Sequence, residues 1–181
     1  MCLVPDLYTA WHAGESSWKN FRSINKYSIG IEISNPGHNY GYKKFNSKQI
    51  GSLTKLLRYL LRKYNIKKQN VLAHSDIAPN RKKDPGEKFP WKKLARQDLC
   101  KWHNLQKGKT GKNRNLRINI YEEKLFLDNL NLIGYSRINK VKFQKGKINL
   151  IKAFQRKFRP DLINGKIDQE CLLISKNLIK T

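Results

Sequence analysis

The segment from Asn104 to Arg117 most constrains how this chain can fold, because it contributes little to a hydrophobic core. It carries five basic residues, two glycines and no acidic residue. A stretch with this composition is typical of a linker between folded parts. The sequence therefore predicts two domains, at residues 1–103 and 118–181, joined by a basic linker at 104–117.

The first of these domains combines a strand pattern with a helix pattern. Tyr27–Ser34 alternates strictly, with isoleucines on one face and polar side chains, including Glu32, on the other, as in a half-buried strand. Asn46 can cap a helix with Gln49 at its third position, and apolar residues then recur at helical spacing as far as Tyr64. These patterns predict a mixed α/β domain.

Further along, Val71–His74 is predicted to be a short buried strand, and Ser75–Pro90, which is rich in proline, a loop. Beyond the linker, apolar residues return at helical spacing in three segments. We expect a small three-helix domain there, with helices over 118–130, 147–158 and 168–179.

The formal net charge of +25 raises the possibility of an anionic partner. Basic residues outnumber acidic ones in all three segments, which indicates a general drift toward lysine, and we expect no specific nucleic-acid partner. No apolar run is long enough for a membrane span, and residues 1–6 lack the features of a secretory signal. Cys2, Cys100 and Cys171 are far apart and form no CxxC motif, so neither a disulfide framework nor a thiolate zinc site is predicted.

His74 and Asp84 are the first candidates for chemistry, because an imidazole and a carboxylate flank a loop stiffened by proline. Zinc accepts such nitrogen and oxygen donors. Spacing alone favours plainer roles, namely a hydrogen-bonded histidine and a solvated aspartate. By the same reasoning Glu32 can be an ion-paired strand carboxylate, and Lys82 one cation in a solvated basic run. Spacing therefore leaves the roles of all four residues open.

Several motifs occur in a fixed order along the first domain: Trp11-His-Ala-Gly14, Ser28-Ile-Gly-Ile-Glu32, His74-Ser-Asp-Ile-Ala-Pro79, Lys82-Lys-Asp-Pro-Gly86 and Phe89-Pro-Trp91. The series resembles the zinc-dependent N-acetylmuramoyl-L-alanine amidase family, which shares its fold with peptidoglycan-recognition proteins. The tail resembles the appended peptidoglycan-binding module of that family. The resemblance implies an α/β fold with a mixed central sheet flanked by helices, followed by a small three-helix domain.

The resemblance also implies a role for each candidate. His74 and Asp84 match two of the three zinc ligands, and zinc activates water and polarises a carbonyl. Glu32 matches the carboxylate that moves the proton, and Lys82 the cation beside the scissile carbonyl. The implied reaction is hydrolysis of the amide between N-acetylmuramic acid and L-alanine in peptidoglycan or muropeptides.

Aromatic residues and His12 are candidates for contacts with the substrate. His12 matches a family position near the cleft, and Trp11 can stack on a sugar ring. Packing in the core is nevertheless the default role for the large aromatics Trp11, Trp18 and Trp91. We keep His12 and Trp11 as candidate substrate-binding residues.

One zinc ligand of the family, a histidine on a strand upstream of Trp11, has no counterpart before His12. We therefore expect the amidase domain at 1–103 to be incomplete at its N-terminus, with three explanations open: a longer natural chain, an inactive remnant, or a third ligand supplied by His12. The alternative function is that of an inactive homologue that only binds peptidoglycan. We expect a monomer, although the sequence does not fix the oligomeric state. The resemblance implies the periplasm or cell envelope, and the lack of an export signal leaves the cytoplasm open.

Overall fold

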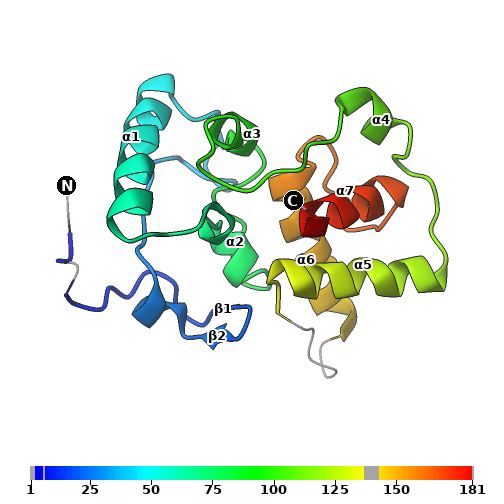
Figure 1. The fold of residues 1–181 in the computed structure, drawn as a ribbon, viewed down its shortest axis with the longest axis horizontal. Helices are drawn as coiled ribbons and strands as arrows, with labels where there is room; N and C mark the ends of the chain where they lie inside the picture. The colour runs from blue at the N-terminus through cyan, green and yellow to red at the C-terminus, as the bar shows by residue number, and fades with distance from the viewer. Residues whose placement is uncertain (1–2, 6, 137–142, 181) are drawn as a thin grey trace.

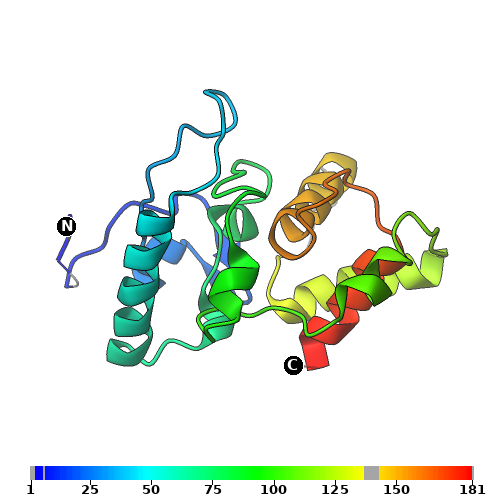
Figure 2. The ribbon, with the colours of Figure 1, turned by 90° about the horizontal axis from the view of Figure 1, so that it is seen from above.

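The computed structural model describes residues 3–5, 7–136 and 143–180. Figures 1 and 2 show α1 and α3 on one side of the molecule and α5, α6 and α7 on the other, with the chain between α3 and α5 crossing from one side to the other and passing through α4. The helices are α1 (Ser47–Lys63), α2 (His74–Ile77), α3 (Trp91–Ala95), α4 (Lys107–Gly111), α5 (Ile120–Ile133), α6 (Phe143–Phe158) and α7 (Gln169–Lys180), with 3₁₀ turns η1 (Ile24–Tyr27) and η2 (Lys68–Asn70) and strands β1 (Ser17–Trp18) and β2 (Phe21–Arg22).

The predicted helix after Asn46 is confirmed as α1, together with its capping box. The Asn46 side chain accepts a hydrogen bond from the Lys48 amide at 2.8 Å, and the Gln49 side chain accepts one from the Asn46 amide at 3.0 Å. These bonds satisfy amides that have no partner within the helix. One face of α1 is buried through Ile50 and Leu57 against the segment that contains α3.

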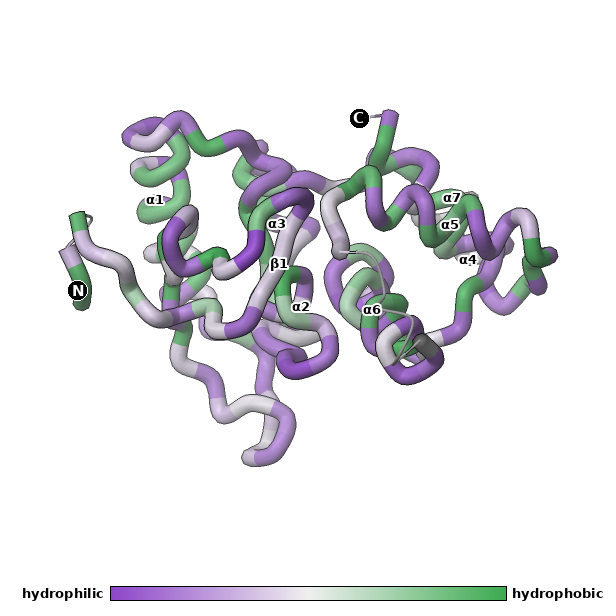
Figure 3. The backbone as a smooth tube through the Cα atoms, turned by 90° about the horizontal axis from the view of Figure 1, so that it is seen from below, coloured by the Kyte–Doolittle hydropathy of each residue, from purple (hydrophilic) through white to green (hydrophobic). Residues whose placement is uncertain are grey.

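The three helices predicted after the linker are also confirmed, with ends that differ from the prediction by at most four residues. A second capping box begins α5, because the Asn119 side chain accepts from the Glu122 amide at 2.9 Å and Glu122 accepts from the Asn119 amide at 3.0 Å. Helix α5 ends at Gly134, whose φ of 132° suits glycine. Figure 3 shows hydrophobic positions recurring between hydrophilic ones along α1, α5 and α7, as in amphipathic helices.

Both predicted strands are wrong. Among the described residues the sheet is a two-stranded hairpin in which β1 pairs antiparallel with β2, and the predicted mixed central sheet is not seen there. Residues 28–34 form no ladder, although Ile31 and Ile33 do pack on a hydrophobic cluster. The alternation in the sequence reports which face is buried, whereas a strand also needs a backbone partner.

Two further local predictions need correction. His74 is the first residue of α2 and not the end of a strand, so the predicted loop after it begins with a helical turn. The predicted linker likewise contains α4. Neither helix is longer than five residues, and segments this short carry too few turns for apolar periodicity to reveal them.

The larger hydrophobic cluster contains residues from both sides of the 104–117 segment. Trp18, Ile24 and Ile77 from the first part pack in it with residues of α5, α6 and α7. A smaller cluster joins α1 to α3. The larger cluster consists of Ala13, Trp18, Ile24, Ile77, Ala78, Phe126, Leu130, Tyr135, Leu150, Ile151, Ala153, Phe154, Phe158, Cys171, Leu172, Ile174 and Leu178.

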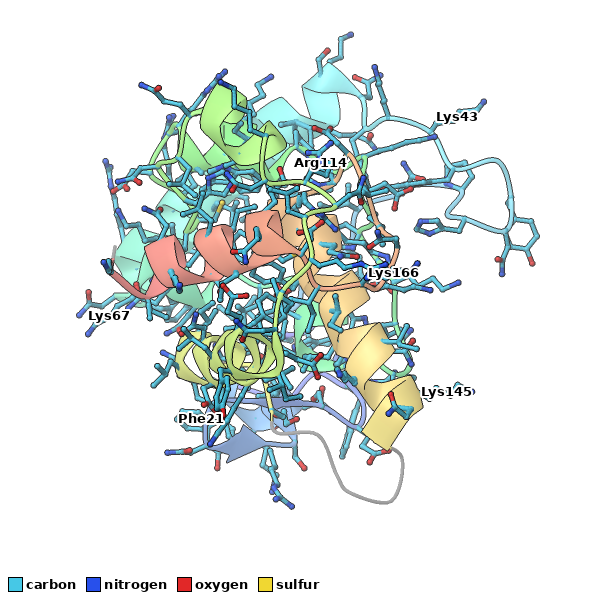
Figure 4. All side chains as sticks on the ribbon, turned by 90° about the vertical axis from the view of Figure 1, so that its right-hand side faces the viewer. Phe21, Lys43, Lys67, Arg114, Lys145 and Lys166 are labelled. Atoms are coloured by element: carbon cyan, nitrogen blue, oxygen red, sulfur yellow. The ribbon has the colours of Figure 1, made fainter. Side chains whose placement is uncertain are left out.

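The positive charge is distributed over the surface. Figure 4 shows Lys43, Lys67 and Lys145 at separate parts of the periphery. Across the ranges that the structure describes, no helix combines the length and apolar content needed to cross a membrane. Cys100 and Cys171 are buried free thiols, and Cys2 lies outside the described residues.

Candidate functional site

His74 and Asp84 meet at the start of α2. His74 Nδ1 lies 3.0 Å from Asp84 Oδ2. The backbone supports this pairing, because the Ser75 amide donates to the Asp84 carbonyl at 3.1 Å and so holds the loop against the first turn of α2. Two residues ten positions apart in the chain thus present their donor atoms side by side.

Both ring nitrogens of His74 face oxygen acceptors. Nδ1 faces Asp84, and Nε2 lies 3.2 Å from the carbonyl oxygen of Ala13. A neutral imidazole has one N–H group. If Nε2 donates to Ala13, the lone pair of Nδ1 faces the Asp84 carboxylate, and a cation between the two would remove that repulsion. A ligating histidine commonly donates its other N–H to a backbone carbonyl in this way. The pair therefore fits two donors of a zinc site.

The electrostatics favour an ionised carboxylate at Asp84. Burial on its own raises the pKa of this group, but its side-chain contact with His74 and the positive charge of the nearby Lys82 lower it below its ordinary value. The Asp84 side chain is 58% exposed and that of His74 only 19%. The carboxylate is thus available to a ligand from solvent, next to a more deeply held imidazole.

A third metal donor is not part of this pair's immediate surroundings. Across the described ranges, no three His, Cys, Asp or Glu side chains gather closely enough to hold a metal ion. His12 uses its ring differently, since Nδ1 lies 3.0 Å from the Ala10 carbonyl and Nε2 lies 2.9 Å from the Ser28 hydroxyl. Among the described residues the arrangement therefore fits two zinc donors, while the ring of His12 is engaged by Ala10 and Ser28.

His12 connects the pair to the segment that carries Glu32. A Cβ atom built on Gly30 would lie 2.5 Å from Cγ of His12, so the imidazole rests directly on that glycine. Glu32 is two residues further along the segment, and it is exposed. Ala13, next to His12, accepts from the ring of His74. The contacts thus run from the Glu32 segment through His12 and Ala13 to the His74–Asp84 pair.

The other predicted site residues differ in exposure. Lys82 is partly buried, and its amide donates to the Ala78 carbonyl at 2.9 Å. Its charge contributes to the lowered pKa of Asp84, which places its cation within electrostatic reach of that carboxylate. Trp11 is 87% exposed and so does not take the default core role, whereas Trp18 and Trp91 are buried as that role predicts.

Arg81 is a structural contributor that the sequence reasoning missed. Its Nη2 atom donates to the Ala13 carbonyl at 2.7 Å and to the Glu15 carbonyl at 2.8 Å. Ala13 therefore accepts from the side chains of both Arg81 and His74. The sequence could not reveal this role, because every residue has a backbone carbonyl that can accept such a bond. In the sequence, Arg81 is simply one cation in a run of three basic residues.

Tyr42 was also missed, and it braces the loop that follows Asp84. Its hydroxyl donates to the Pro85 carbonyl at 2.7 Å and accepts from the Lys88 amide at 2.9 Å. Burial raises the pKa of Tyr42 to about 12, so the phenol remains protonated and able to donate. Next to it, His38 Nε2 lies 3.0 Å from Glu87. These contacts join the segment that carries His38 and Tyr42 to the loop that directly follows Asp84.

Comparison with known proteins finds matches over both halves of the chain. A family model described as N-acetylmuramoyl-L-alanine amidase matches residues 1–87. The N-acetylmuramoyl-L-alanine amidase AmiD of Escherichia coli K12 is 35% identical over 98% of this chain and 66% of its own length. The 1,6-anhydro-N-acetylmuramyl-L-alanine amidase AmpD of Haemophilus influenzae is 35% identical over 46% of this chain and 44% of its own. The chain thus spans 66% and 44% of these curated relatives.

Solved structures of AmiD and AmpDh3 also match this chain. A complex of E. coli AmiD with its substrate anhydro-N-acetylmuramic acid-L-Ala-D-gamma-Glu-L-Lys matches with a TM-score of 0.86 at 35% identity, covering 99% of this chain and 72% of that one. AmpDh3 from Pseudomonas aeruginosa in complex with anhydromuramic pentapeptide matches with a TM-score of 0.82 at 30% identity, with the same coverage. Both matches extend through α5, α6 and α7.

Proposed function

This chain belongs to the N-acetylmuramoyl-L-alanine amidase family, and from that premise we propose that it hydrolyses the amide between N-acetylmuramic acid and L-alanine of the peptidoglycan stem peptide. The observation that carries the proposal is the His74–Asp84 pair, with donor atoms 3.0 Å apart and the second ring nitrogen directed at a backbone carbonyl. A catalytic zinc site uses three protein donors; this pair supplies two of them, with the ring orientation of a ligating histidine.

In this proposal His74 and Asp84 hold zinc, which as a Lewis acid supplies polarisation of the scissile carbonyl. Glu32, exposed on the segment against which His12 lies, takes a proton from the attacking water and delivers it to the leaving amine. Lys82 directs its ammonium at the oxygen that becomes negative as the carbonyl carbon turns tetrahedral. The ionised state of Asp84 suits a metal ligand.

The substrate class follows from the relatives. The two matched amidase complexes contain anhydromuramoyl peptides. We infer that this chain also acts on soluble muropeptides that carry the lactyl–L-alanine amide. The exposed indole of Trp11, which neighbours His12, supports a stacking contact with the sugar ring.

The test is to incubate the full chain with anhydromuropeptide and Zn²⁺ and to follow the released stem peptide by mass spectrometry. Glu32→Gln and Lys82→Met should each reduce turnover by about 100-fold or more, as removal of a proton-transfer group or an oxyanion donor does. Lys83→Met is the matched control, because Lys83 is an exposed neighbour of Lys82 with no role in the proposed chemistry. We expect it to retain wild-type turnover.

Two results would contradict the proposal. One is a wild-type chain that binds Zn²⁺ but releases no stem peptide. The other is turnover that survives Glu32→Gln unchanged. If the chain instead sedimented with insoluble peptidoglycan, with and without Zn²⁺, and cleaved nothing, the result would support a cell-wall binding protein.

A further inference from the structure

Lys157 on α6 is almost fully buried, far along the chain from the candidate site. It is 3% exposed, and its ammonium donates to Asp76 Oδ2 at 2.7 Å and to the Val71 carbonyl at 3.1 Å. The ammonium also lies 4.5 Å from the centre of the Trp91 ring. A buried ammonium is costly unless it is paired. Lys157 therefore has one well-defined place, against the segment that leads into α2.

Tyr135, just after α5, holds the other oxygen of the same carboxylate. Its hydroxyl donates to Asp76 Oδ1 at 2.7 Å, and its ring packs edge-on against Trp18 at 5.0 Å. Asp76 is itself 1% exposed. Both oxygens of one buried carboxylate are thus bound by residues from the C-terminal helical part of the chain.

Asp76 in turn shapes the first turn of α2. Its Oδ2 atom accepts from the Ala73 amide at 2.8 Å, and its own amide donates to the Ala73 carbonyl at 3.0 Å. His74 is the residue directly after Ala73, inside this closed loop of hydrogen bonds. The side-chain bond also satisfies an amide that would otherwise lack a partner at the helix start. The orientation of His74 thus depends on Asp76.

We propose that Lys157 and Tyr135 are positioning residues for His74, so that the C-terminal helices form part of the zinc-binding site. They act through Asp76, which they hold in the geometry that sets the first turn of α2. The proposal rests on the proposed function, because it takes His74 as a metal ligand. It differs from the view of the C-terminal helices as a separate wall-binding module, in which these helices would leave the site unaffected.

The structure supports this assignment over simple packing. The contacts are directional: an ammonium and a phenol each donate to a separate oxygen of Asp76. A further contact between the two parts does not involve Asp76, since Asn149 donates to Asn80 at 3.2 Å. Holding the two parts together therefore does not depend on Asp76 alone, whereas the Asp76 side chain directly binds the Ala73 amide at the start of α2.

The experiment measures the full chain and two informative variants, Lys157→Met and Tyr135→Phe. Zn²⁺ affinity is measured by calorimetry, and the imidazole ¹⁵N resonances of the chain's four histidines are recorded at fixed pH. Lys157→Met should weaken Zn²⁺ binding by about tenfold, the lower end of the loss seen when partners outside the ligand shell are removed. The His74 resonances should shift in both variants, while those of His38 serve as an internal reference.

Two controls separate positioning from stability. Lys145→Met changes an exposed lysine of the same helix, which projects outward in Figure 4, and should leave Zn²⁺ affinity within twofold of wild type. Leu178→Ala removes a fully buried side chain from the shared cluster without touching Asp76. It should lower the melting temperature and keep wild-type Zn²⁺ affinity while folded. If Lys157→Met does not fold, Tyr135→Phe, which keeps the ring, decides.

The outcomes are distinct. Weaker Zn²⁺ binding and shifted His74 resonances in the folded variants, with neither change in Leu178→Ala, support the proposal. Unchanged affinity and unchanged His74 resonances in the variants overturn it, even where the wild type cleaves muropeptide. If the wild type binds Zn²⁺ but cleaves nothing, the proposed function fails and these measurements still decide the positioning role. If Zn²⁺ binding is too weak to measure, the His74 resonances decide.

Discussion

Gly30→Ala is expected to disturb the candidate site by a steric route that can be worked out from the structure. The added Cβ would lie 2.5 Å from Cγ, 2.7 Å from Cδ2 and 2.8 Å from Cβ of His12. Carbon atoms pack at about 3.5–4.0 Å, so the histidine must move by about 1 Å. Rotation of the ring alone is insufficient, because the Cβ of His12 is also too close. The backbone around His12 must therefore shift.

This shift has an energetic and a functional consequence. Moving the ring strains its contacts with the Ala10 carbonyl and the Ser28 hydroxyl. Inserting a methyl group into a filled space typically costs about 1–3 kcal/mol, which is the expected loss in the free energy of unfolding. Turnover should fall as well, because Glu32 lies two residues along the same segment and a misplacement of about 1 Å can cost about 100-fold in rate.

The assay is urea denaturation followed by circular dichroism, combined with a double-mutant cycle. His12→Ala removes two of the three clashing atoms, so Gly30→Ala should cost less than half as much in that background. Gly51→Ala is the control, since Gly51 lies in α1 with open space around it, and it should stabilise the chain by about 0.5–1 kcal/mol. The reasoning is refuted if Gly30→Ala costs the same with and without the His12 ring.

Two further predictions concern charged groups. The pKa of Asp84 is lowered in the folded chain, so its ionised form stabilises the protein at pH values above the ordinary aspartate pKa. This stabilisation is lost as the pH falls through the pKa of the folded state. Acid unfolding monitored by fluorescence should therefore depend less on pH in Asp84→Asn than in the wild type. Arg159→Met removes the guanidinium that lies 2.5 Å from the buried carboxylate of Asp168, while Glu170 keeps its ion pair with Arg114, and should lower the free energy of unfolding by about 3–5 kcal/mol in urea. A free energy of unfolding within about 0.5 kcal/mol of the wild-type value, which is the range of ordinary surface substitutions, would contradict the prediction for Arg159→Met.

Helices were the part of the fold most accessible to sequence reasoning. The capping box that begins α1 uses Asn46 and Gln49, three positions apart, so both partners are visible in one short stretch. Helices α5, α6 and α7 were located from apolar periodicity, and only their ends differed. In each case the interactions that specify the element lie within a few residues of one another.

Strand prediction failed for the opposite reason. The alternation in Tyr27–Ser34 correctly indicated that Ile31 and Ile33 pack inward. A strand, however, is defined by hydrogen bonds to a distant backbone segment, and among the described residues this segment has no such partner. The same limit explains Val71–His74, where the bond between Asp76 and the Ala73 amide begins a helical turn instead.

For the candidate site, the sequence by itself singled out His74, Asp84, Glu32 and Lys82 as candidates for the chemistry, because their motifs occur in the order of the amidase family; their roles stay predictions. Only the tertiary structure showed that the ring of His74 faces the Ala13 carbonyl, and that a lysine and a tyrosine from the chain beyond the basic segment bind Asp76, two residues after His74. The physical reason is that carbonyl acceptors are the same at every residue, and that buried ion pairs join residues whose separation in the chain leaves no pattern. The 104–117 segment illustrates both sides of this division: its composition predicts a linker between two domains, while in the structure it contains α4 and the larger hydrophobic cluster includes residues from both sides of it.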